Sequence, residues 1–146
     1  MAIYLHVQAG SLQLLLDALG VHEVLSLDAL AVGGQGDHIE WREQVLSSVP
    51  VRSFFGQTQG GDATMGVVYS AGDTDVPMML KVDAVHGLRN ISEAEWLPMP
   101  RLPLATMVFF DALAKDLNSD AQLYRLRRPL DRVLFQSALT QDRGAD

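Results

Sequence analysis

The chain has 146 residues, which is the length of a single domain. With 48% hydrophobic and 20% charged residues we expect a globular protein, and the net charge of −7 argues against nucleic-acid binding or an anionic membrane surface. The absence of cysteine excludes disulfides, thiolate catalysis and cysteine-type zinc sites. Because no apolar run approaches the roughly 20 residues of a membrane span, and MAIYLHVQAG is not a signal peptide, we expect a cytoplasmic protein without direct membrane insertion.

Short alternating segments dominate the first half of the chain. Residues 2–16 predict a hairpin that turns at Ala9-Gly10-Ser11. Residues 17–27, DALGVHEVLSL, fit either a turn with a short strand or a helical turn, and the two periods compete. A glycine-rich loop is expected at 31–38. In EWREQVLSSVPVRSFFG, residues 40–56, alternation predicts a strand with Val45, Ser47, Val49 and Val51 on one side.

The second half repeats this pattern after a glycine-rich connection at residues 57–66, which is the best candidate boundary between two halves. VVYS and VPMMLKV predict a second hairpin with Asp and Gly in its turn. A further strand follows in DAVHGLRNIS, and the three prolines of residues 97–103 predict an extended loop. MVFF at 107–110 and QLYRL at 122–126 indicate two more strands. Pro129 opens a terminal helix, whose apolar stripe is Leu130, Val133, Leu134 and Ala138.

This succession of roughly nine short strands with little helix is typical of small barrels or a sandwich. The residues that could carry chemistry do not assemble into a site. His6, His22, His38 and His86 lack metal-ligand spacing, and GGQG at 33–36 has no following Lys-Ser/Thr. We therefore predict no catalytic residue, no metal and no cofactor. The arginines at 125, 127, 128 and 132 form a basic cluster, which is either a solvated face or a surface for an acidic partner.

Four ordered blocks carry a family likeness. They are LLLDALGVHEVLSL (14–27), WREQVLSSVPVRSFFG (41–56), MMLKVDAVHGLRNISEAEWLPMP (78–100) and FFDALAKD with AQLYRLR (109–127). Together these blocks resemble the CheW-like chemotaxis coupling domain, of which the chain would be a divergent member. The resemblance implies a mainly β fold of two intertwined five-stranded β-barrel subdomains with a C-terminal helix. It implies a single domain over 1–146, with a first barrel at approximately 12–60, a second at approximately 65–110, and terminal strands and helix completing the pair.

The same resemblance implies a non-enzymatic adaptor or scaffold in chemotaxis signal transduction. Its expected partners are the regulatory domain of a CheA-type histidine kinase and the cytoplasmic tip of a chemoreceptor. The residues placed in contact-bearing blocks are Val24, Leu25, Arg42, Val45, Val49, Val82, Val85, Gly87 and Leu88. An alternative is a divergent CheW-like module that binds a private partner or self-associates without kinase coupling.

The second block departs from the family pattern beside Arg42. Glu43 occupies the position of a glycine, and Ser48 that of a proline, with Pro50 two places later. A glycine there suggests a backbone that needs room or a positive φ. We therefore expect Glu43 to force a changed turn and to add negative charge next to Arg42.

Overall fold

A computed structural model of the protein describes residues 2–27, 38–51, 64–70, 72, 77–101, 109–116 and 121–128. The described residues are mostly strand. The strands are β1 (Ala2–Ala9), β2 (Leu12–Asp17), β3 (Val21–Ser26), β4 (His38–Trp41), β5 (Gln44–Pro50), β6 (Met65–Tyr69), β7 (Met78–Val82), β8 (Ala84–Ile91), β9 (Phe110–Lys115) and β10 (Gln122–Leu126). Two 3-10 turns, η1 (Ala18–Gly20) and η4 (Glu93–Glu95), join strands. The mainly β class is confirmed, whereas the predicted terminal helix lies outside the described residues.

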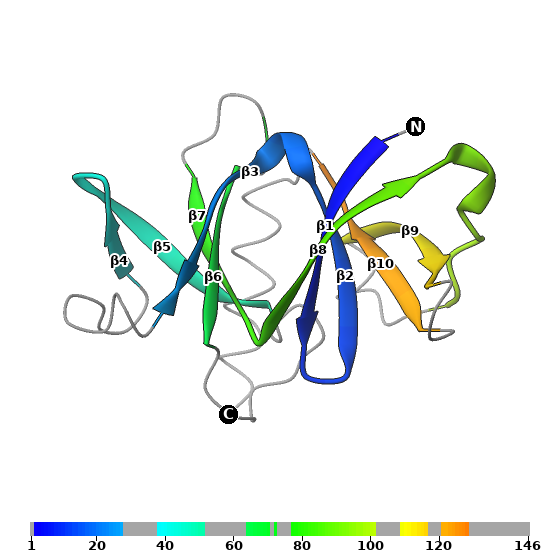
Figure 1. The fold of residues 1–146 in the computed structure, drawn as a ribbon, viewed down its shortest axis with the longest axis horizontal. Coiled ribbons are helices and arrows are strands. Elements are labelled where there is room, and N and C mark those ends of the chain that lie inside the picture. The colour runs from blue at the N-terminus through cyan, green and yellow to red at the C-terminus, as the bar shows by residue number, and fades with distance from the viewer. Residues whose placement is uncertain are drawn as a thin grey trace.

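The strands form two curled five-stranded sheets that lie side by side (Figure 1). The first sheet has the order β8-β1-β2-β10-β9, and the second has the order β3-β6-β7-β5-β4. Each sheet contains one parallel pair, β2 with β10 and β5 with β7. Sheet membership is therefore interleaved along the chain. It does not follow the expected consecutive barrels at 12–60 and 65–110, because β2 and β8 both belong to the first sheet.

Several predicted elements are confirmed and two are revised. The 2–16 hairpin is β1–β2, and VVYS with VPMMLKV forms the β6–β7 hairpin. The undecided segment 17–27 contains both structures in succession, η1 and then β3. Of the strand predicted at 107–110, residues 107 and 108 lie outside the described residues, and β9 runs from Phe110 to Lys115. The buried positions of β9 continue through Leu113 and Ala114, beyond the predicted range.

The largest apolar core lies between the two sheets. Its members come from both sheets, and the two phenylalanines that precede and begin β9 are among them. They are Leu5, Val7, Ala9, Leu14, Leu16, Val49, Val51, Val67, Tyr69, Met78, Leu80, Val82, Phe109, Phe110 and Leu126. We call this set the shared core. Because both sheets bury one face in it, neither sheet can bury that face alone.

A smaller core fills the inside of each sheet. In the first sheet Tyr4, Leu15 and Leu123 pack together, and Trp96 packs against them. In the second sheet Leu46, Val68 and Met79 pack together. Residues that alternate along one strand therefore enter different cores. This explains apolar runs such as LQLLLD in β2, whose three central leucines are all buried.

Tryptophan helps to close each sheet. In the second sheet the Nε1–H of Trp41 on β4 donates to Glu23 Oε2 on β3, at 2.5 Å, so the two edge strands are tied through side chains. In the first sheet the chain after β8 returns to β9, where Leu97 N–H donates to Leu113 O at 2.8 Å. Trp96 packs edge-on against Tyr4 there, with ring centroids 5.4 Å apart. Both tryptophans of the chain thus lie where the ends of a sheet meet.

Candidate functional site

The β4–β5 hairpin turns through only two residues, because Trp41 and Gln44 already pair across the strands. These residues are Arg42 and Glu43, and their φ angles are +46° and +65°. Positive φ at both central positions matches a type I′ turn, for which Asn-Gly is the usual sequence. The expected change of turn is therefore absent. Glu43 itself takes the positive φ that a glycine would supply, at a cost in backbone strain.

Replacing Glu43 with glycine is expected to stabilise the protein by about 0.5–1 kcal/mol. Relief of left-handed strain in an L-residue is worth about 1–2 kcal/mol, and the greater freedom of glycine in the unfolded chain offsets part of it. Urea unfolding measures the change. Glu43→Ala is the matched control, since it removes the carboxylate but keeps a Cβ at positive φ. An equal gain from both variants would assign the effect to charge and contradict the strain argument.

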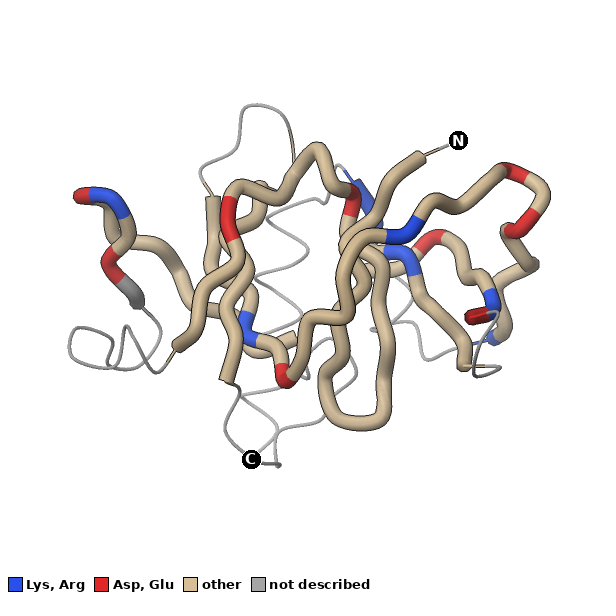
Figure 2. Tube along the Cα trace, in the orientation of Figure 1, with Lys and Arg blue, Asp and Glu red and all other residues tan. Residues whose placement is uncertain are grey.

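The tip of this hairpin lies at one end of the molecule, where basic and acidic residues adjoin (Figure 2), and Arg42 is exposed in its turn. Its guanidinium stacks over the Trp41 ring, 4.8 Å from the centroid, and its NH2 lies 3.7 Å from Glu23 Oε1. Glu23 therefore joins both side chains, Trp41 through a hydrogen bond and Arg42 through a loose ion pair. Exposed pairs of this kind contribute about 0–1 kcal/mol, so the arrangement orients Arg42 without making it essential to folding.

The two halves of β5 have different surroundings. Val45 is 68% exposed, whereas Val49, on the same side by alternation, is 6% exposed and lies in the shared core. The first half of β5 pairs only with β4, and the second half pairs with β7 inside the second sheet. Val45 is therefore available to a partner, and Val49 contributes packing.

The remaining predicted contact residues divide in the same way. Val24 on β3 and Leu88 on β8 are exposed, Leu88 by 66%. Leu25 packs against the core inside the second sheet, and Val85 packs against the shared core. Val82 is buried in the shared core, and Gly87 has φ +110° with open space where a Cβ would lie. The exposed subset is Arg42, Val45, Val24 and Leu88.

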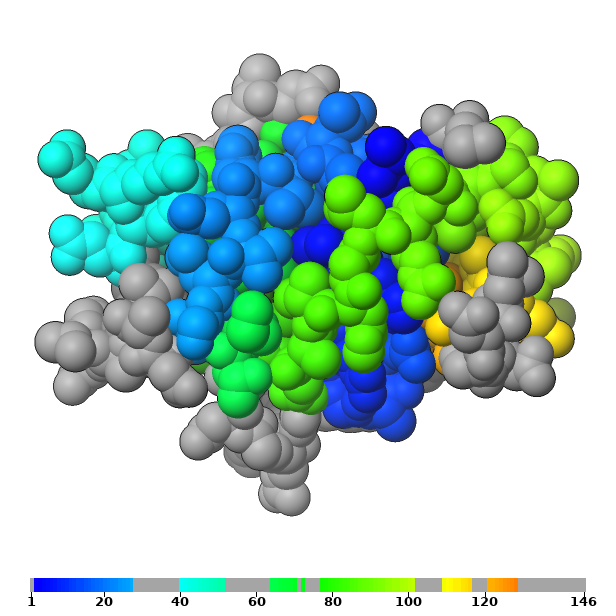
Figure 3. All heavy atoms as spheres, viewed as in Figure 1, coloured from blue at the N-terminus to red at the C-terminus, as the bar shows by residue number. Residues whose placement is uncertain are grey.

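The exposed subset lies on three elements. Arg42 and Val45 are on the β4–β5 hairpin, while β3 and β8 are the edge strands of different sheets. Both edge strands present atoms on one face of the molecule (Figure 3). Scattered exposed apolar residues are normal, but exposed apolar residues on unpaired strand edges are a common feature of contact surfaces.

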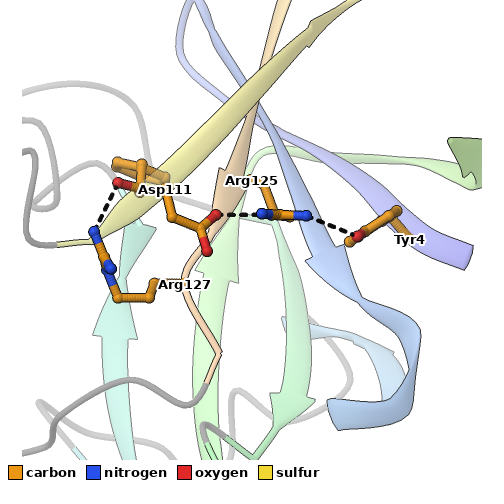
Figure 4. Close-up of polar contacts among 5 residues, drawn as sticks. Tyr4, Asp111, Arg125 and Arg127 are labelled. Carbon is orange, nitrogen blue, oxygen red and sulfur yellow. Dashed lines mark hydrogen bonds and ion pairs between the residues drawn. The ribbon is translucent and has the colours of Figure 1, made fainter. Parts of the chain in front are cut away.

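The basic cluster is engaged within the fold. Arg125 Nε donates to Asp111 Oδ1 at 2.7 Å and its NH1 to Tyr4 Oη at 3.3 Å (Figure 4). Its guanidinium also stacks on Trp96, 4.4 Å from the ring centroid. Burial alone would lower the pKa of Arg125, but the bonds to Asp111 and Tyr4 raise it overall. Arg125 therefore has a structural role within the first sheet, and neither interpretation from the sequence, a solvated face or a partner surface, describes it.

The next two arginines of the cluster bond to backbone. Arg127 NH2 donates to Phe110 O at 3.4 Å, and Arg128 Nε donates to Ser70 O at 3.2 Å. Arg128 NH1 also lies 3.8 Å from Asp17 Oδ2, so Arg128 connects β10 to both β2 and the end of β6. Arg132 lies outside the described residues.

No cluster of side chains suited to metal binding is found in the described part of the chain. No group of three or more His, Asp or Glu side chains there is arranged to hold a metal ion. Nor does any helix in those residues have the length and apolar character to cross a membrane. Sequence reasoning overlooked the contact between Glu23 and Trp41, because Glu23 lies in the segment 17–27, for which strand and helical turn both remained open. It also overlooked the contact between His6 and His86, because the two residues are far apart in the sequence.

Two curled five-stranded sheets around one shared core, tied at their edges through side chains, define a two-barrel class of mainly β domain. Among solved structures, the chain is similar to the scaffolding protein TtCheW from Thermoanaerobacter tengcongensis. The TM-score is 0.69 and the identity 18%, over 86% of this chain and 88% of that chain. The fold is therefore CheW-like, as the four sequence blocks predicted. No protein-family model matches the chain, and no curated protein matches it at a significant level.

Proposed function

We propose that the protein is a non-enzymatic adaptor that couples a CheA-type histidine kinase to chemoreceptors through protein–protein contacts. The observation that carries the proposal is the likeness to a scaffolding protein across most of both chains. The cytoplasmic partners would be the kinase regulatory domain and the receptor tip. The contacts would come from the exposed subset, with apolar side chains for burial and a charge for register.

The hairpin is the stronger of the contact regions. Val45 offers apolar surface on a strand whose tip carries an exposed cation, and arginine flanked by apolar surface is enriched at binding hot spots. The strained turn adds support, because positive φ in ordinary residues persists mainly where surrounding structure or function requires it.

Titration calorimetry against the kinase regulatory domain and a receptor-tip fragment from the same genome tests the proposal. We expect a dissociation constant of about 10 μM or tighter for at least one of them, equivalent to about −7 kcal/mol. Arg42→Ala should weaken that binding by about five-fold or more, while the unfolding midpoint stays nearly unchanged because the Arg42–Glu23 pair is exposed. Absence of binding to every kinase and receptor of that genome would overturn coupling.

The alternative is a CheW-like module that serves a private partner or self-associates. Two observations favour it: Glu43 adds a negative charge beside Arg42, and Glu23 already occupies the guanidinium. A partner that requires a free arginine at the hairpin tip would bind this chain less well. Light scattering across protein concentration tests self-association. A monomer at all concentrations would remove self-association and leave only the private partner.

A further inference from the structure

Two histidines from different strands meet at the edge of the first sheet. The rings of His6 on β1 and His86 on β8 have centroids 4.7 Å apart and planes inclined by 45°. His6 is 2% exposed, whereas His86 is exposed. His6 Nε2 lies 2.5 Å from Gln13 Oε1, and His86 Nε2 lies 2.8 Å from Gln8 Oε1. An amide oxygen only accepts, so in both contacts the imidazole Nε2–H is the donor.

This tautomer leaves His6 Nδ1 as a bare acceptor. The atom is buried and has no hydrogen-bond partner among the described residues. A proton added to His6 would go to Nδ1, and the new N–H would point at no acceptor. Leaving a buried charged donor unpaired costs more than leaving a neutral acceptor unpaired. The neutral ring is therefore the form that the closed structure accommodates.

A β-bulge in β8 brings His86 onto His6. Val7 pairs with Val85 and His6 pairs with Gly87, so His86 is the extra residue on its strand. Gly87 takes φ +110°, a conformation that L-residues rarely adopt. Bulges of this kind redirect a side chain and interrupt strand pairing. Gln8 holds the redirected ring, since its Oε1 accepts from His86 and its Nε2 donates to Gly10 O at 2.8 Å.

The described charged groups around His6 mainly oppose its protonation. Burial lowers the pKa of His6 below its ordinary 6.5, the hydrogen bond to Gln13 counteracts this, and His86 and Arg89 lower the pKa further. Asp116 raises it, but that carboxylate is shared with Arg89, whose NH2 lies 3.7 Å from Asp116 Oδ2. Two rings in contact also resist carrying a positive charge each.

We propose that the His6–His86 pair is a proton-sensitive latch, which holds β8 on β1 at neutral pH and releases β8 as the pH falls. β8 is the element that opens, because among the described strands it is an edge strand paired only with β1, whereas β1 also pairs with β2. In the released state His6 reaches water and accepts a proton at its ordinary value. At pH values between 6.5 and the lower pKa of His6 in the closed state, the open form binds more protons than the closed form. Each unit by which the pH falls in this range therefore raises the equilibrium constant for opening by up to about tenfold.

Amide hydrogen exchange of the full chain tests the latch without any partner, so its outcome is separate from that of the proposed function. Protection factors, which remove the intrinsic pH dependence of exchange, are measured at pH values above and below 6.5. We expect the opening constant of β8 amides to rise by up to about tenfold for the unit below pH 6.5. The amides of β7 and β10 should change far less, because interior strands open at higher free energy.

Variants separate the latch from general acid unfolding. His6→Gln should abolish the pH dependence of β8, and His86→Gln should weaken it by removing a group that lowers the pKa of His6. His22→Gln is the matched control: its ring contacts Ser70 Oγ at 2.7 Å in the second sheet, and β8 should respond as in the wild type. Should His6→Gln fail to fold, an NMR titration of the imidazole groups in the wild type replaces it. We then expect the His6 signals and the chemical shifts of the β8 amides to change over the same pH range.

Three results would overturn the latch. The first is β8 protection that does not vary with pH. The second is an equal loss of protection in β7 and β10, which would indicate global unfolding. The third is a wild-type response in His86→Gln, which would remove the pair from the explanation.

Discussion

Replacing Gly20 with alanine is expected to lower the free energy of unfolding by about 1–3 kcal/mol, the usual range for inserting a methyl group into a close-packed site. An added Cβ would lie 2.7 Å from Ser70 O, 2.7 Å from Tyr69 Cε2 and 2.9 Å from Arg128 Nε. The first of these atoms is backbone and cannot rotate away. Equilibrium urea unfolding measures the loss.

The position of Gly20 explains why relaxation is difficult. Gly20 ends η1, where the chain passes from β2 in the first sheet to β3 in the second. Its carbonyl accepts from Ser70 N–H at 2.8 Å, and Ser70 O accepts from Arg128 Nε. Moving the Gly20 backbone outward would disturb both bonds and the Tyr69 ring, which belongs to the shared core.

Leu19→Ala is the control for this prediction. Leu19 precedes Gly20 in the same turn but is 83% exposed, so its truncation should change stability by no more than about 0.5 kcal/mol. Equal losses from the two variants would mean that η1 as a whole is sensitive. A loss below about 0.5 kcal/mol for Gly20→Ala would show that the junction can widen, contrary to the expectation.

Val45→Lys is expected to reduce partner binding by about tenfold or more, equivalent to about 1.4 kcal/mol. In the proposed interface the valine side chain is buried, and a lysine would bring an unpaired ammonium group into that contact. The free protein should remain stable, because Val45 is exposed and its cross-strand neighbour is Glu40, an opposite charge for the new lysine. Calorimetry with the kinase regulatory domain and receptor tip measures the affinity, and thermal unfolding measures the stability.

Ala94→Lys provides the matched control for charge. Ala94 is exposed in η4, which follows β8 at the opposite end of the molecule from the β4–β5 hairpin (Figure 1), so the same gain of one positive charge should leave affinity close to the wild-type value. Equal weakening by both variants would attribute the effect to long-range charge. Wild-type affinity in Val45→Lys would remove the hairpin from the interface.

The prediction of strands succeeded where the signal was local. Alternation and turn residues located β1, β2, β6 and β7, because strand period and turn conformation depend on neighbouring residues. Local sequence also accounts for the start of η4, where Ser92 and Glu95 form a capping box. Of the described residues in the strand predicted at 107–110, only Phe110 belongs to β9, because an apolar run alone does not show where pairing with β10 begins.

The candidate site was harder to predict, because its key distinction is not local. Val45 and Val49 have the same residue type and the same parity on one strand, yet one is exposed and the other is buried. Arg125 was read as surface charge, and its partners Tyr4 and Asp111 come from strands distant in sequence. Neither fact can be inferred from residue type or spacing.

The sequence by itself determined a mainly β chain with short strands and glycine-containing turns, since these follow from period-two burial and local backbone preferences. The order of the four blocks also determined the CheW-like fold, which the structural likeness bears out. Only the tertiary structure decided which strands share a sheet, how tryptophans tie the sheet edges, and which valines reach solvent. Those features depend on pairings between distant segments, and such pairings are set by the burial of two sheets against one core rather than by any local pattern.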